Sequence, residues 1–263
     1  ADISTSDRRP HNLDALIAEA RPVPFAPPSP TPLQRIAGCG VYLRTDFWAR
    51  IESGGSYGHT CYVAKELAAV TEQFVSFMAH PYKLLDDYGV RQVVLPPPGG
   101  PDTEETIVNA TSHYHVALKA AFEAIRPAYI YERLCLGNHV GALLSRQMQI
   151  PYIVEYNGSE ISMRRSFDGA GYIYEKEYLQ AEALAFKQAT MISVVSAEVK
   201  AGLVQTPGQV NRLYTLRPTA GLDESFDDLF ALACLKGWRD QTQVRGIADG
   251  ALHIRPRMEE VFD

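Results

Sequence analysis

The sequence predicts an α/β fold in which a Rossmann-like parallel sheet carries helices on both faces. From residue 34 onward, short apolar runs alternate with longer amphipathic stretches, which is the order of strands and helices in such a fold. The short runs are apolar throughout rather than at every second residue, which is typical of strands buried on both faces. With 263 residues, the chain is long enough to bury a core of this kind.

The individual elements follow from these runs and from the residues that bound them. We expect strands over residues 35–44, 74–79, 91–96, 128–134, 151–158, 191–196 and 212–218. We expect helices over residues 12–20, 60–70, 103–125, 139–149, 174–189, 197–206 and 224–238, and a short helix or loop over 80–89. Asn12 is the expected N-cap of the first helix, and Thr103 or Asp102 that of the helix that ends at Arg126–Pro127.

The composition divides the chain into three segments. Residues 1–32 hold seven of the 17 prolines. Because proline cannot donate a ladder hydrogen bond, we expect an extended proline-rich arm over 1–33. The alternating strands and helices then form one domain over 34–221. Residues 222–263 lack this alternation, so we expect a helical tail or the remnant of a linker there.

Charge and residue types exclude several classes of function. The formal net charge of −6 argues against a nucleic-acid partner, because a phosphate backbone is bound by a basic surface. No apolar run approaches the roughly 20 residues that span a membrane, and the polar start shows no secretory signal. The histidines are scattered, so we expect no metal site. Cys39, Cys61, Cys135 and Cys234 form no Cys-x-x-Cys pair, and we expect reduced, mostly buried thiols in a cytoplasmic protein.

A glycine-rich turn, Ser53-Gly-Gly-Ser56, follows the first expected strand and leads into a helix. One interpretation is a plain turn. The other is a phosphate site, because backbone N–H groups at a helix start face an anion and a side chain at Gly54 or Gly55 would block its approach. The turn matches neither G-x-G-x-x-G nor the P-loop pattern.

Polar residues also end the later strands, where ligands bind in parallel sheets. Glu132 and Arg133 should emerge at the rim as a structural ion pair or as contacts to substrate hydroxyls or a carboxylate. Glu155 lies in an apolar strand, so it needs a partner such as Arg133. Asn157-Gly158 is either a turn or a ligand contact, and Ser196 lies at the end of a further strand.

Four stretches, in this order, resemble the first domain of GT-B retaining glycosyltransferases of family four, also called glycosyl transferase group one. They are "SGGSYGHTCYVAKELA", "PAYIYERLCLGNHVGALLSRQMQIPYIVEYNGSE", "EALAFKQATMISVVSAEVKAGL" and "RPTAGLDESF", and the resemblance covers about residues 36–226. It implies a single GT-B half-domain with a nucleotide-sugar donor as substrate and no other cofactor. By resemblance, the donor phosphates face Gly54, Gly55 and Ser56. By resemblance, the acceptor side of the cleft is lined by Glu132, Arg133, Asn157, Gly158 and Glu160.

The resemblance further implies a glycan or lipid-linked acceptor, polysaccharide biosynthesis, peripheral membrane association and a missing C-terminal domain. That second domain carries a Glu-x7-Glu motif in the family, and this chain has none. The family hinge Pro-Asn-Gly-Val-Asp is also altered, because Thr219-Ala220 replaces the asparagine. We therefore expect the first domain of a transferase, inactive alone. The alternatives are a non-catalytic glycan- or nucleotide-binding module with a GT-B half-fold, and another nucleotide-sugar enzyme such as an epimerase.

Overall fold

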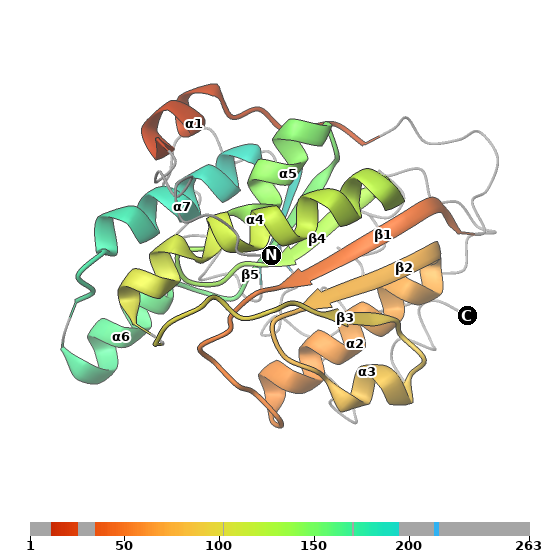
Figure 1. Ribbon diagram of the computed structural model, residues 1–263, viewed down its shortest axis with the longest axis horizontal. Helices are drawn as coiled ribbons and strands as arrows, with labels where there is room; N and C mark the ends of the chain where they lie inside the picture. Colours follow the sequence, from red (N-terminus) through yellow and green to blue (C-terminus); the bar gives the residue numbers. More distant parts are fainter. Residues whose placement is uncertain (1–11, 26–34, 102, 170, 195–212, 216–263) are drawn as a thin grey trace.

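The computed structural model describes residues 12–25, 35–101, 103–169, 171–194 and 213–215 (Figure 1). The expected helices over 197–206 and 224–238, the altered hinge, Ser196 and Cys234 lie outside these residues. So do most of the expected arm and the whole of the expected tail, and both stay predictions.

A seven-stranded sheet forms the centre of the fold, and every neighbouring pair of strands is parallel. The strands lie in the order β3-β2-β1-β4-β5-β6-β7. Their bounds are β1 Ile36–Arg44, β2 Thr71–Met78, β3 Gln92–Val94, β4 Tyr129–Arg133, β5 Tyr152–Tyr156, β6 Met191–Val194 and β7 Leu213–Thr215. The order reverses beside β1, so the predicted α/β fold with a Rossmann-like parallel sheet is confirmed.

Helices cover both faces of the sheet, as the sequence predicts (Figure 1). Their bounds are α1 Leu13–Glu19, α2 Gly55–Val70, α3 Lys83–Asp87, α4 Glu104–Ile125, α5 Val140–Met148, α6 Glu160–Asp168 and α7 Glu175–Gln188. Helices α4, α5 and α7 lie on one face, with α1 packed on α7, and α2 and α3 lie on the other. Each face buries its own apolar cluster, one around Tyr152 and Val154 and one around Tyr42 and Ile153.

Local sequence explains where the helices begin and end. The side chain of Asn12 accepts a hydrogen bond from Ala15 N, and that of Thr103 from Thr106 N, so both expected N-caps are confirmed. At the end of α4, Arg126 adopts a left-handed φ of 48° immediately before Pro127. Of the four cysteines, Cys39, Cys61 and Cys135 are free and buried, as expected.

Two helices differ from the prediction. Helix α2 begins at Gly55 rather than Thr60, because the second glycine of the turn is itself the first residue of the helix. Helix α6 was not predicted. Ser159 caps it by accepting from Ser162 N, but only Ile161, Met163 and Phe167 of its nine residues are apolar, so no apolar stretch marks it in the sequence.

Candidate functional site

The candidate site lies where the carboxyl ends of β1, β4 and β5 meet the N-terminus of α2. Adjacent parallel strands end at the same edge of the sheet, so β1 places Arg44, β4 places Arg133 and β5 places Glu155 close together. The loop after β1 then brings Gly54, Gly55 and Ser56 over these strand ends.

The two glycines at the start of α2 differ in what the fold demands of them. Gly54 is the N-cap and has a φ of +86°, which favours glycine. Gly55 has no such φ, and a Cβ at Gly55 would meet nothing within 4 Å. The fold therefore accounts for Gly54 but gives no steric reason for the absence of a side chain at Gly55.

Arg44 is buried beneath this helix start, with 2% of its side chain exposed. Its guanidinium donates to both carboxylate oxygens of Asp46, at 2.9–3.2 Å. It also donates to the carbonyl of Ser56 at 3.2 Å and to the hydroxyl of Thr60. Burial alone would lower the pKa of Arg44, but the hydrogen bonds and charge of Asp46 outweigh burial and raise it, so Arg44 stays charged.

A second guanidinium reaches the same helix start from β4. Arg133 Nη2 donates to Ser56 Oγ at 3.3 Å, and Arg44 Nη2 donates to the same oxygen at 3.2 Å. Two cationic side chains therefore converge on the first turn of α2, where backbone N–H groups and the helix dipole already favour an anion.

Glu155 connects Arg133 to the rest of the site. Its carboxylate is 2% exposed and accepts from Arg133 Nη1 at 2.8 Å, from the Tyr131 hydroxyl at 2.8 Å and from Asn157 Nδ2 at 2.9 Å. The Nε2 atom of His59, on α2, lies 3.0 Å from Oε1 of the same carboxylate. The predicted pairing of Glu155 with Arg133 is confirmed.

The surroundings of Glu155 determine its ionisation. Burial alone would raise the pKa of this carboxyl group. The contact with His59, the charge of Arg133 and the Tyr131 hydroxyl together outweigh burial and lower the pKa to about 2. Glu155 is therefore a fixed negative charge at neutral pH.

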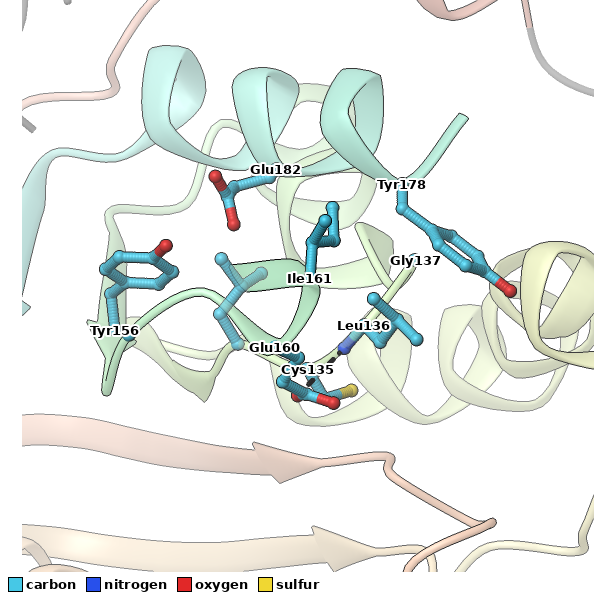
Figure 2. A pocket seen from close by; sticks show the side chains of 10 residues that line it. Cys135, Leu136, Gly137, Tyr156, Glu160, Ile161, Tyr178 and Glu182 are labelled. Carbon is cyan, nitrogen blue, oxygen red and sulfur yellow. Dashed lines mark hydrogen bonds between the residues drawn. The ribbon is translucent and has the colours of Figure 1, made fainter. Parts of the chain in front are cut away.

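Glu160 lines a small pocket beside this cluster, together with residues of α7 and of the loop after β4 (Figure 2). Its Oε1 accepts from Leu136 N at 3.2 Å, and Figure 2 shows Glu182 on the opposite side of the pocket. The open volume is about 20 Å³, which holds about one water molecule. Burial and the charge of Asp46 raise the pKa of Glu160 to about 7, so this carboxyl group titrates near neutral pH.

Gly158 also lines the pocket and has a φ of +117°, which favours glycine. A Cβ at Gly158 would meet nothing within 4 Å, so its backbone conformation alone explains the residue. Asn157, immediately before it, is tied to Glu155 by the hydrogen bond above. The structure thus brings Ser56, Arg133 and Asn157 into one network and places Gly158 and Glu160 in the adjoining pocket.

Glu132 does not emerge at the rim, and that expectation is wrong. Side chains alternate along a strand, so Glu132 points to the opposite face from Arg133 and is fully buried. It accepts from Asn138 Nδ2 at 2.9 Å, from Gly141 N at 3.4 Å and from the Tyr152 hydroxyl. Burial raises its pKa to about 7 despite these hydrogen bonds. Through its hydrogen bonds from Asn138 and Gly141, Glu132 anchors the start of α5.

Sequence reasoning did not identify three members of the network, namely Arg44, Asp46 and His59. Arg44 is the last residue of β1, so its place at a strand end was a usable signal. His59 lies three residues after Ser56, which places both on one face of α2. Within the described residues, no group of three or more His, Cys, Asp or Glu could hold a metal ion.

The comparisons with known proteins do not assign this chain to a family. No protein-family model matches the sequence, and neither does any curated protein. Among solved structures, Anabaena Alr3699/HepE in complex with UDP-glucose is 12% identical, with a TM-score of 0.44, over 76% of this chain and 50% of that chain. A glycosyltransferase from Rickettsia africae ESF-5 is 14% identical, with a TM-score of 0.44, over 77% and 49%. Sucrose-phosphate synthase from Thermosynechococcus elongatus is 13% identical, with a TM-score of 0.48, over 71% and 49%. The chain spans about half the length of each, and at these values the likeness assigns no activity.

A helix that spans a membrane must be both long and apolar. No helix among the described residues has both properties.

Proposed function

We propose that this chain is the first, acceptor-side domain of a GT-B glycosyltransferase that moves a sugar from a nucleotide-diphosphate sugar to a glycan or lipid-linked acceptor. The observation that carries the proposal is the convergence of Arg44 and Arg133 on Ser56, at a helix start where Gly55 leaves the backbone uncovered. Free backbone N–H groups at a helix start and a guanidinium such as that of Arg133 bind phosphate oxygens. Arg44 donates its hydrogen bonds to Asp46, Ser56 and Thr60, so it contributes its positive charge from beneath the helix start.

In this proposal, the donor diphosphate lies against Gly54, Gly55 and Ser56. The acceptor lies toward Asn157 and toward Gly158 and Glu160, which line the pocket after β4 and β5. Arg133 lies between the donor and the acceptor, because it contacts Ser56 on one side and Glu155 on the other. Glu132 supports the cleft from within the core and does not touch a substrate.

The sequence resemblance supports a retaining enzyme of family four, and we include that mechanism in the proposal. Transfer then requires the departing diphosphate to be stabilised in a cleft shielded from water. This chain supplies one wall of such a cleft. A second domain with the Glu-x7-Glu motif would supply the other wall and hold most of the nucleotide.

The proposal is tested by product assay and calorimetry on the 263-residue chain with a panel of nucleotide sugars. A few backbone and side-chain hydrogen bonds net about 1 kcal/mol each, so we expect dissociation constants of about a millimolar and no turnover. Steady product formation or micromolar binding would contradict the assignment as half of a site. Binding of glycans without any nucleotide sugar would favour a non-catalytic binding module instead.

A further inference from the structure

Exposed apolar side chains are concentrated in α6 and in the segment that follows it. Phe167 and Ile173 are 81% and 85% exposed, and Met163 is 55% exposed. Met163 and Phe167 are four residues apart, so they lie on one face of the helix. Of the apolar residues of α6, only Ile161 is buried. The fold therefore leaves most of the apolar surface of this helix uncovered.

The segment after α6 is held in place, so these side chains belong to a defined surface. Ile173 N and Tyr174 N both donate to Glu104 Oε2, at 2.7 and 3.2 Å, and Glu104 is the first residue of α4. Figure 1 shows α6 at one end of the molecule, beside the starts of α4 and α7. The exposed side chains therefore lie at an outer end of the fold.

Cations accompany these apolar side chains. The guanidinium of Arg164 lies over the ring of Tyr172, with its Cζ atom 4.3 Å from the ring centroid, and its Nε atom has no hydrogen-bond partner among the described residues. Lys176 is exposed in the first turn of α7. Arg165, in contrast, is paired with Glu175. We name the following residues the α6 surface: Met163, Arg164, Phe167, Ile173 and Lys176.

The composition of the α6 surface favours a lipid headgroup region as its occupant. Large apolar side chains beside cations and half-buried tyrosines, here Tyr172 and Tyr174, are typical of segments that insert at a membrane interface. The cores of protein–protein interfaces are depleted of lysine, whereas Lys176 belongs to this surface. The formal net charge of −6 repels an anionic membrane at long range, so the cations must act within about 8 Å, the Debye length at physiological salt.

We propose that the α6 surface rests on an anionic membrane surface and that the acceptor is lipid-linked. Glu160 and Ile161 belong to the first turn of α6 and line the pocket on the proposed acceptor side. A membrane in contact with α6 therefore lies next to that side, and a lipid-anchored acceptor reaches it without leaving the bilayer. The choice of acceptor rests on the proposed function, whereas the membrane contact does not.

Co-sedimentation of the 263-residue chain with vesicles tests the membrane contact. The vesicles consist of phosphatidylcholine with about one third phosphatidylglycerol, or of phosphatidylcholine alone, at physiological ionic strength. We expect the chain to bind the anionic vesicles, and to bind the neutral ones at least about fivefold more weakly, because one cation near an anionic surface changes the partition by about that factor.

Variants of the α6 surface assign the contact. Phe167→Ser combined with Ile173→Ser should lower the partition about tenfold or more, because two apolar side chains no longer insert. Val116→Ser is the matched control, because Val116 is 61% exposed on α4, and it should bind as the wild type does. Arg164→Gln should lower binding to anionic vesicles about fivefold. Arg50→Gln, at a side chain that is 73% exposed, should leave it unchanged. Circular dichroism confirms that each variant is folded.

Phe167→Trp keeps a large apolar side chain at this position and adds a reporter. It should bind the anionic vesicles as the wild type does. Its emission should shift to the blue on binding and should be quenched by brominated acyl chains. Both changes are measured relative to the wild-type chain, which has two tryptophans of its own. Emission that vesicles leave unchanged would contradict insertion of this side chain.

The acceptor class is tested with octyl glucoside, below its micelle concentration, against free glucose. Because the alkyl chain has the exposed apolar side chains to contact, we expect amide NMR shifts over residues 158–167 with the alkyl glycoside and none with glucose. An equal response to both, or no response to octyl glucoside, would refute a lipid-linked acceptor.

The membrane contact is overturned if the wild-type chain does not bind anionic vesicles, if Phe167→Ser with Ile173→Ser binds as well as the wild type, or if Val116→Ser loses as much. A dimer in sedimentation velocity that only the double variant disrupts, without vesicle binding, would assign the surface to a second copy instead. Vesicle binding through the α6 surface, combined with no response to any nucleotide sugar, would refute the proposed function and leave the membrane contact standing.

Discussion

Arg133 Nη1 lies 2.8 Å from Glu155 Oε1, and the two residues stand opposite each other in the register of β4 and β5. The carboxylate is almost fully buried, so its charge depends on this partner. Replacing only the arginine leaves a buried negative charge without its cation, which is among the more destabilising changes in a protein.

Arg133→Met should therefore lower the free energy of unfolding by about 3 kcal/mol, measured by denaturant melts at neutral pH. The matched control is Arg50→Met, because Arg50 pairs with Glu52 while both side chains are more than 70% exposed. That change should cost less than about 0.5 kcal/mol. An equally small effect at Arg133 would mean that Glu155 and Arg133 are both solvated.

The low pKa of Glu155 gives a defined loss of stability in acid. Its pKa of about 2 in the folded protein lies below the usual glutamate value of 4.5. Between these values the unfolded chain binds more protons than the folded one, so stability falls as the pH falls from about 4.5 to about 2. The contribution above pH 4.5 is about 3 kcal/mol.

Denaturant melts between pH 5 and pH 2 test this contribution. The wild-type protein should lose stability steeply over that interval, and Glu155→Gln should have a shallower profile because the titrating group is gone. Parallel profiles for the two proteins would show that the carboxyl group at 155 has an ordinary pKa.

Gly141, in the first turn of α5, allows the helix to approach the buried Glu132. A Cβ at this position would collide with the Glu132 carboxylate and lie 2.7 Å from the Tyr152 ring. Gly141→Ala should therefore destabilise the protein by about 1–3 kcal/mol in a thermal or denaturant melt. Gly58→Ala in α2 is the control, because its Cβ would meet only Tyr62 at 3.5 Å, and we expect no loss of stability. Equal stabilities of the two variants would contradict the packing described for Glu132.

The sheet and most helices could be predicted from sequence because each strand is a continuous apolar run bounded by turn residues. The pairing of Glu155 with Arg133 was predictable for a similar reason, since a charge inside an apolar strand requires a partner. Glu132 was expected at the rim beside Arg133, but it is fully buried. The alternation of side chains along a strand sends neighbours to opposite faces, and only the packing of α5 shows that the face of Glu132 is closed at this strand end.

The contacts of His59 and Arg44 illustrate what sequence reasoning could not supply. Their contacts to Glu155 and Ser56 depend on how far α2 lies over the ends of β1, β4 and β5, and no local pattern gives that distance. Helix α6 was missed because it is short and mostly polar, so the cap at Ser159 was its main signal in the sequence.

The substitution Gly55→Ala allows the role of this glycine in stability to be measured separately from its role in binding. Position 55 is the first residue of α2, its backbone needs no positive φ, and a Cβ there meets no other atom. Alanine should therefore raise the free energy of unfolding by up to about 1 kcal/mol, because it restricts the unfolded chain and favours the helix. A loss of stability in a denaturant melt would mean that the fold itself requires glycine at this position.

The central claim is that the start of α2 receives the phosphates of a nucleotide sugar. The most direct measurement is a comparison of amide NMR spectra of the wild-type chain and Gly55→Ala during titration with UDP-glucose, with Gly58→Ala as the control. We expect shifts concentrated at Gly54–Tyr57 in the wild type and in Gly58→Ala, with a dissociation constant of about a millimolar, and much smaller shifts in Gly55→Ala. Shifts that are absent from Gly54–Tyr57, or unchanged in Gly55→Ala, would contradict the account.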